Sequence, residues 1–159
     1  MNAMTARGLS LAVVVAVWTA ISHVGKLDMQ LWPVIVGLAC FVAAGSGAAA
    51  FQKSAVGTVT GVVWALLYVA VSGALGHQAL LDALVLGAAM FGIVAQSRVP
   101  VLGYTAGVIA GAGVTMGALG IRTLNVQGGI RVAIALVIGC GLGYGAEYVA
   151  GMLKKARPA

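Results

Sequence analysis

Few side chains in this sequence could do chemistry, and one of them is an acid inside an apolar run. Glu147 lies seven residues before Lys154, about 10 Å from the end of its predicted helix at about 1.5 Å per residue. Lipid does not solvate a carboxylate, so an acid in such a place is a functional candidate by default. Glu147 could line a cytoplasmic vestibule, hold a proton or pair with Arg98. Alternatively, it could reach into the lipid head groups.

Other candidates are aromatic or polar residues inside apolar segments. Trp64 lies near the middle of its segment, where its indole N–H needs a hydrogen-bond partner. It could form the wall of a solute path or pack in the core. Hydroxyl and amide groups could line a path for a small polar solute or hydrogen-bond between helices. The candidates for a pore or solute path are Glu147, Trp64, Ser46, Gln52, Thr105 and Arg98.

The sequence predicts neither catalysis nor a cofactor. No nucleophile is placed with a base, no carboxylates are paired, and there is no phosphate-binding loop. Cys40 and Cys140 lie in separate apolar runs, so they form neither a metal-ligand spacing nor a disulfide framework. We interpret them as small packing residues. The chain is therefore expected not to be an enzyme and to bind no metal and no cofactor.

The composition sets the class of protein to which these residues belong. The chain has 159 residues, of which 62% are hydrophobic, 8% are charged and 24 are glycine. Soluble domains carry about 25% charged residues, so a soluble enzyme, a nucleic-acid-binding protein and a disordered chain are excluded. The net charge of +6 then reflects membrane topology and contact with anionic lipid.

The apolar runs predict an all-α integral membrane protein with a single domain of about six helices. One crossing needs about 20 apolar residues, and the apolar runs show no alternation of period two, which argues against a β-barrel. The first run could be a cleaved signal peptide, but it has no clear cleavage site and is interpreted as a retained helix. The expected spans are 7–24, 31–51, 55–73, 79–95, 100–120 and 130–152, with turns at 25–28 and 52–54.

The distribution of basic residues favours an orientation with both termini in the cytoplasm. With the N-terminus inside, six basic residues lie on the inner side and three on the outer side, as the positive-inside rule requires. The inner set is Arg7, Lys53, Arg98, Lys154, Lys155 and Arg157, and the outer set is Lys26, Arg122 and Arg131.

Two segments hint at an internal repeat. Segments 33–43 and 100–110 share four identities at an offset of 67 and both continue into a Gly-x-Gly element. Each would be the middle helix of a three-helix set, so the second set would be inverted, with a site near the midplane between the two halves. Chance similarity between Ala/Gly/Val-rich segments is the alternative. The identities are Pro33/Pro100, Val34/Val101, Ala39/Ala106 and Ala43/Ala110, and the expected helix breaks are Gly45, Gly47, Gly111 and Gly113.

Glycines four residues apart recur along the later spans. Small residues at this spacing let helix backbones approach closely, so we expect a tight bundle with a face for self-association. Lining of a pore by these glycines is the alternative. The glycines expected to pack are Gly57, Gly61, Gly103, Gly107, Gly139 and Gly143.

Four segments resemble a known family. FVAAGSGAAA at 41–50, TGVVWALL at 60–67, VLGYTAGVIAGAG at 101–113 and LVIGCGLGYG at 136–145 are similar to the domain-of-unknown-function family 1097 of small bacterial inner-membrane proteins. The stretch around Trp64 is the most distinctive, and the resemblance extends from about Leu11 to Gly151. It implies a helical membrane fold in the bacterial inner membrane and supplies no site residues.

Two functions fit these features. The first is a passive channel or permease for a small solute of the urea, ammonia, carbon dioxide or bicarbonate class, assembled as a homo-oligomer in the lipid bilayer. The second is a non-transporting membrane subunit that binds lipid or a partner protein through its Gly-rich helix faces. A cavity around Glu147 and Trp64 would favour the first function, and dry packing around them would favour the second.

Overall fold

The computed structural model describes residues 3–24, 30–120 and 123–155. The turn expected at 25–28, with Lys26, and the basic residues Arg122 and Arg157 lie outside the described residues. Over the described residues the chain forms six α-helices and two short 3-10 helices. They are α1 (Ala3–Val24), α2 (Leu31–Ala44), α3 (Gly47–Ala74), α4 (Ala79–Ala95), η1 (Gln96–Arg98), η2 (Pro100–Leu102), α5 (Thr105–Leu119) and α6 (Val126–Lys155).

The turn between the second and third helices lies earlier than the sequence predicts. α2 ends at Ala44, so the span expected at 31–51 is too long, and the turn expected at 52–54 lies inside α3. Gly45 and Gly47 have φ angles of 120° and 76°, which residues with a Cβ atom rarely adopt. The predicted break at these glycines therefore exists, but it ends one helix and starts the next.

The second Gly-rich segment contains no break. α5 runs without interruption from Thr105 to Leu119, through Gly111 and Gly113, so the break expected there is wrong. The helix also begins later than expected, because Pro100 opens the separate 3-10 helix η2. Gly103 lies in the turn before α5 and not at a helix contact, so its assignment to helix packing is wrong.

The helices are those of a membrane protein. Among the described residues, three helices are long and apolar enough to cross a bilayer, at Gly47–Ala74, Ala79–Arg98 and Val126–Met152. Three shorter apolar segments accompany them, at Gly8–Ser22, Leu31–Ala44 and Thr105–Leu119. Apolar helices of this kind indicate a multi-pass protein associated with a lipid bilayer.

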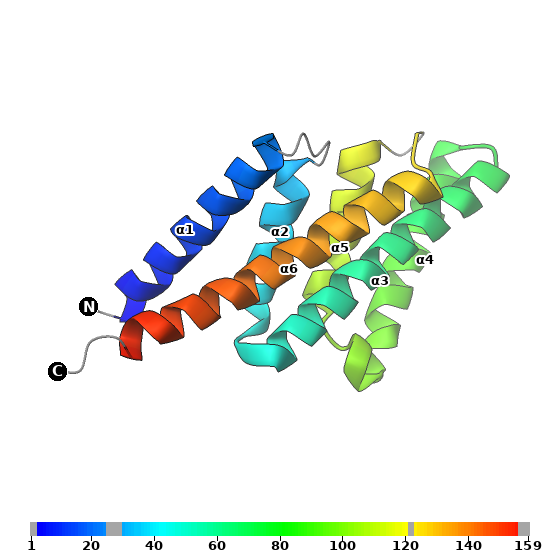
Figure 1. Ribbon diagram of the computed structural model, residues 1–159. Coiled ribbons are helices and arrows are strands. Elements are labelled where there is room, and N and C mark those ends of the chain that lie inside the picture. Colours follow the sequence, from blue (N-terminus) through cyan, green and yellow to red (C-terminus); the bar gives the residue numbers. More distant parts are fainter. Residues whose placement is uncertain (1–2, 25–29, 121–122, 156–159) are drawn as a thin grey trace.

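The bundle is arranged around two long helices, α3 and α6, which run diagonally across the view (Figure 1). α3 and α6 run in opposite directions across the front of the view, and the shorter α2 and α5 cross behind them. α1 flanks one side, against α6, and α4 flanks the other side, against α3. The start of α1 and the end of α6 lie at the same end of the bundle, which we call the inner end. The opposite end is the outer end.

Glycine allows α2 and α6 to cross in backbone contact. A Cβ atom added at Gly37 would overlap the carbonyl oxygen of Leu136, and one added at Gly139 would overlap that of Val34. Neither obstacle is a side chain that could rotate away. The two helices can therefore approach this closely only because both positions lack a side chain.

α3 and α5 cross by the same device. A Cβ atom at Gly61 would overlap the carbonyl oxygen of Val108, and one at Gly111 would overlap that of Thr58. Close contacts thus involve five of the six glycines that the spacing singled out. These five are Gly57, Gly61, Gly107, Gly139 and Gly143.

The two crossings correspond residue by residue. Adding 74 to the number of each residue of α2 at its crossing gives the residue of α5 that makes the same contact at the other crossing. Adding 78 relates the residues of α3 to those of α6 in the same way. The ring contact of Phe51 with Tyr144, with centroids 6.0 Å apart, likewise corresponds to the contact of Gly129 with Leu66. The matched pairs at the crossings are Val34/Val108, Gly37/Gly111, Thr58/Leu136 and Gly61/Gly139.

The shift of 74 differs by seven residues from the offset of 67 that the sequence identities indicate. Seven residues are about two helical turns, so both alignments place the same face of α2 over the same face of α5. The difference arises because Pro33 lies in the first turn of α2, whereas Pro100 lies in η2, ahead of α5. Sequence identity alone therefore misaligned the two segments by two turns.

Candidate functional site

Glu147 lies against the turn between α2 and α3. Its carboxylate Oε2 accepts a hydrogen bond from the backbone N–H of Gly47, at 2.8 Å. This N–H opens α3, and the N-terminus of a helix favours negative charge. Arg98 is exposed in η1, and the only ion pair among the described residues joins His77 and Asp82. The structure therefore ties Glu147 to a helix end and not to Arg98.

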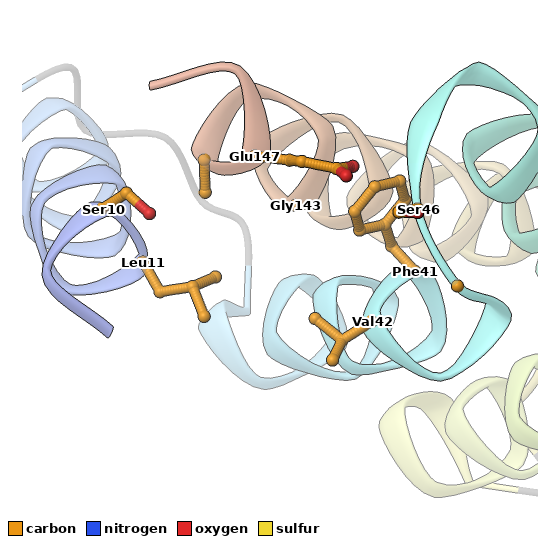
Figure 2. A pocket seen from close by; sticks show the side chains of 9 residues that line it. Ser10, Leu11, Phe41, Val42, Ser46, Gly143 and Glu147 are labelled. Carbon is orange, nitrogen blue, oxygen red and sulfur yellow. The ribbon is translucent and has the colours of Figure 1, made fainter. Parts of the chain in front are cut away.

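A cavity of about 100 Å³ opens beside this carboxylate. We call it the inner cavity, and Figure 2 shows it between α1, α2 and α6, with the carboxylate of Glu147 close to Ser46. Irregular backbone at membrane depth must be buried in protein or line a cavity, and this turn lines one. The residues that line the inner cavity are Ser10, Leu11, Phe41, Val42, Gly45, Ser46, Gly143, Ala146 and Glu147.

Trp64 lies in a separate environment between α3 and α4. Its ring covers Gly92, and its indole Nε1–H donates to Oε1 of Gln96 at 2.9 Å. An apolar cavity of about 230 Å³, bordered by Trp64 and Tyr68, lies beside the ring. The Nε2 atom of Gln96 is buried without a hydrogen-bond partner among the described residues. This arrangement provides Trp64 with the partner that the sequence requires, but at the periphery and not beside Glu147.

Replacing Trp64 by phenylalanine should destabilise the protein by about 1–3 kcal/mol, because the partly buried side-chain carbonyl of Gln96 would lose its donor. Thermal unfolding in detergent measures the change. The double variant Trp64→Phe/Gln96→Leu should recover part of the loss, since it removes both partners. A Trp64→Phe variant as stable as the parent would contradict this role.

The remaining predicted candidates are not brought together. Gln52 is exposed on α3, and Thr105 is a half-buried residue that opens α5. Of the six residues proposed for a solute path, the structure places only Ser46 and Glu147 in one cavity.

A third cavity lies toward the outer end, with a volume of about 180 Å³. We call it the outer cavity. Its polar groups are the amide of Gln30 and the guanidinium of Arg131, which is exposed. Pro33, Leu119, Gly128, Val132 and Ala135 complete its lining.

One face of α6 connects the two cavities. Residues on this face are spaced by three or four positions, as one side of a helix requires. The distance from Gly128 to Glu147 is about 28 Å at about 1.5 Å per residue, close to the thickness of a hydrocarbon core of about 30 Å. In order from the outer end, the face consists of Gly128, Val132, Leu136, Cys140, Gly143 and Glu147.

Between the cavities, the core has two layers of opposite character. The apolar layer, nearer the outer cavity, is the buried cluster of Val62, Val114, Val132 and Leu136. The same two shifts relate each of these four residues to a buried residue in the other half of the chain. The pairs are Val62/Cys140, Val114/Cys40, Val132/Ser54 and Leu136/Thr58, and we call the second members of these pairs the polar layer.

The polar layer lies next to the inner cavity. Cys140 contacts the hydroxyl groups of Ser54 and Thr58 and lies near Cys40. Its thiol donates to the carbonyl oxygen of Gly37 at 3.3 Å. Phe41, which lines the inner cavity, also packs with Cys140 in the core. Phe41 thus separates the inner cavity from the polar layer.

Sequence reasoning missed the polar layer, although one signal was present. Ser54 and Thr58 lie four residues apart on one face of α3, and both are fully buried. Cys40 and Cys140 were assigned to packing one at a time, and only the fold brings them together. The layer offers hydroxyl, thiol and carbonyl groups but no charge, which suits hydrogen bonding to a neutral molecule.

No group of three His, Cys, Asp or Glu side chains that could hold a metal ion occurs among the residues searched, which are those that the structure describes. Comparison with curated proteins and with solved structures found no match. The family model described as "Protein of unknown function (DUF1097)" matches residues 8–151. The helices, the two crossings and the inner and outer cavities lie almost wholly within this range. The chain belongs to the DUF1097 family of proteins of unknown function.

Proposed function

We propose that this protein is a small-solute channel or permease of the bacterial inner membrane, without enzymatic activity, and that its solute path follows the cavity-facing side of α6. The observation that carries the proposal is that one helix face connects two cavities over about the thickness of a hydrocarbon core. In this arrangement Glu147 lies at the inner mouth and Arg131 at the outer mouth.

The proposed topology has six crossings with both termini in the cytoplasm and two inverted three-helix halves. The matched crossings of α2 on α6 and of α5 on α3 support it, because each middle helix packs on the last helix of the other half. In inverted-repeat transporters the site lies at the interface of the repeats. The two core layers lie between these same helices, and the path passes through both.

The proposed path would be closed in the middle in this conformation. Phe41 covers the polar layer from the inner side, and Val132 and Leu136 close the outer side. Transport would require these side chains to move. The polar layer would then hydrate more readily than the apolar layer, because hydroxyl groups can exchange their present hydrogen bonds for bonds with water.

A flux assay tests the proposal. The purified protein in liposomes should raise the permeability to at least one small solute above that of empty vesicles, as measured by stopped-flow light scattering. Liposomes with an unrelated six-helix protein, prepared at the same protein-to-lipid ratio, control for leakage. Equal permeability of all three preparations to urea, ammonia, carbon dioxide and bicarbonate would reject the proposal.

A non-transporting subunit is the second candidate, and two observations favour it. The first is the closed core between the inner and outer cavities, and the second is an open pair of glycines on α6. Gly141 and Gly145 lie four residues apart on α6, and a Cβ atom at either position would meet nothing within 4 Å. This open small-residue pair could accept a helix of a second copy or of another protein. Cross-linking at this face without solute flux would favour the second candidate, whereas flux through a homo-oligomer would favour the first.

A further inference from the structure

We propose that the inner cavity selects solutes that present N–H donors, ammonium or a small neutral amide such as urea, and rejects small carboxylates and bicarbonate. The proposal rests on the proposed function, because it assigns a substrate class to the inner mouth of the same path. Of the solutes that the sequence suggests, which are urea, ammonia, carbon dioxide and bicarbonate, it excludes the anion bicarbonate.

The fixed carboxylate of Glu147 is the first reason. One oxygen is held by the N–H of Gly47 at 2.8 Å, and the side chains that the structure describes, which exclude those of Arg7, Lys154 and Lys155, make no other hydrogen bond or ion pair with this carboxylate. An ionised carboxylate accepts hydrogen bonds at both oxygens and donates none. A ligand bound at the remaining oxygen must therefore bring the donor.

The size of the cavity is the second reason. Its volume of about 100 Å³ is several times the roughly 10–15 Å³ that one water molecule needs by the same measure. A solute with a few non-hydrogen atoms therefore fits this space. The apolar side chains of Leu11, Phe41 and Val42 form much of the wall, and the polar side chains in the lining are those of Ser10, Ser46 and Glu147.

The charge at the cavity is the third reason. None of the residues that line it is basic. A small anion in this space would meet the carboxylate with no basic side chain among the lining residues, and like charges in a poorly solvated site repel strongly. Beyond Phe41, the hydroxyl groups of Ser54 and Thr58 extend the uncharged hydrogen-bonding surface.

The test uses a matched pair of carboxylate-to-amide variants in liposomes. Glu147→Gln retains an oxygen that can accept from Gly47, so the turn should stay folded, but it removes the negative charge. Asp82→Asn makes the same chemical change near the start of α4, away from the inner and outer cavities. Fluxes of urea, methylammonium and formate are measured for both variants and for the parent, and thermal unfolding checks that each is folded.

Glu147→Gln should lower the urea and methylammonium fluxes about tenfold, the usual effect of losing a hydrogen bond to a charged group. Its formate flux should rise or stay the same, and Asp82→Asn should leave all three fluxes unchanged. A loss confined to methylammonium would assign the site to the cation, and a loss confined to urea would assign it to the neutral amide.

Two results would overturn the inference and leave the proposed function intact. One is a Glu147→Gln protein with parental urea and methylammonium fluxes. The other is an equal fall for formate, which would show a general loss of transport and not a loss of selectivity. Absence of flux in the parent for every solute would instead reject the proposed function itself.

Discussion

Gly139→Ala should destabilise the protein by about 3 kcal/mol, at the upper end of the usual cost of overpacking a core. The added methyl group would overlap the carbonyl oxygen of Val34, and a backbone atom cannot move aside as a side chain can. α2 and α6 would have to separate, and both core layers would lose contacts. Thermal unfolding in detergent, followed by size-exclusion chromatography, measures the loss.

Gly141→Ala is the matched control, two residues further along the same helix. A Cβ atom at this position meets nothing within 4 Å, and alanine is favoured over glycine in a helix interior by about 1 kcal/mol. The same substitution should therefore be neutral or stabilising. Opposite signs at Gly139 and Gly141 would support the crossing, and equal effects at the two positions would contradict it.

The corresponding crossing provides an independent repetition of this test. Gly111→Ala should destabilise the protein because its methyl group would overlap the carbonyl oxygen of Thr58. Gly113→Ala, on the same helix, should be neutral or stabilising, because a Cβ atom there would meet nothing within 4 Å. If the two halves are built alike, the Gly111/Gly113 pair should behave like the Gly139/Gly141 pair.

These glycine pairs also show how far the sequence determines the fold. The spacing of four identified Gly139 and Gly143 as packing residues, but it identified Gly141 and Gly145 equally well. Only the partner helix distinguishes the two faces of α6, because the partner contacts one face and leaves the other open. Periodicity thus predicts that a helix packs closely, whereas the choice of face is a tertiary property.

The helix ends show a similar limit. The Gly45–Gly47 and Gly111–Gly113 segments look alike in sequence, yet the first is a chain reversal and the second continues a helix. In the second segment Gly111 packs against the backbone at Thr58, and this contact stabilises the helical conformation. The candidate site shows the same limit. The sequence indicated Glu147 as an isolated acid and Gly47 as a helix break, but only the fold shows that the two are hydrogen-bonded.

Modification of Cys140 by a small thiol reagent should block transport almost completely. Cys140 lies on the face of α6 that connects the two cavities and is fully buried, so an adduct would occupy the middle of the proposed path. Overpacking a core by even one small group costs about 1–3 kcal/mol, and about 1.4 kcal/mol corresponds to a tenfold change in rate. Methyl methanethiosulfonate is a suitable probe, with urea flux and intact-protein mass as the readouts.

The two native cysteines provide the matched variants. The double variant Cys40→Ala/Cys140→Ala should retain flux after treatment, because both thiols of the polar layer are then absent. Cys40→Ala alone should still lose flux, because Cys140 remains on the connecting face. Labelling should be faster when the reagent is added from the side of the inner cavity, which is the cytoplasmic side in the proposed topology, because the polar layer adjoins that cavity. Excess urea should slow the labelling of Cys140 if solute and reagent share one path.

The sidedness of labelling separates a path through the core from one elsewhere in the protein. The apolar layer of Val62, Val114, Val132 and Leu136 contains no hydroxyl or thiol group, so it should exclude water and reagent from the outer side more effectively than the polar layer does from the inner side. A protein that transports urea while Cys140 stays unmodified from both sides would place the path outside this core. Flux that persists after complete modification of Cys140 would lead to the same conclusion.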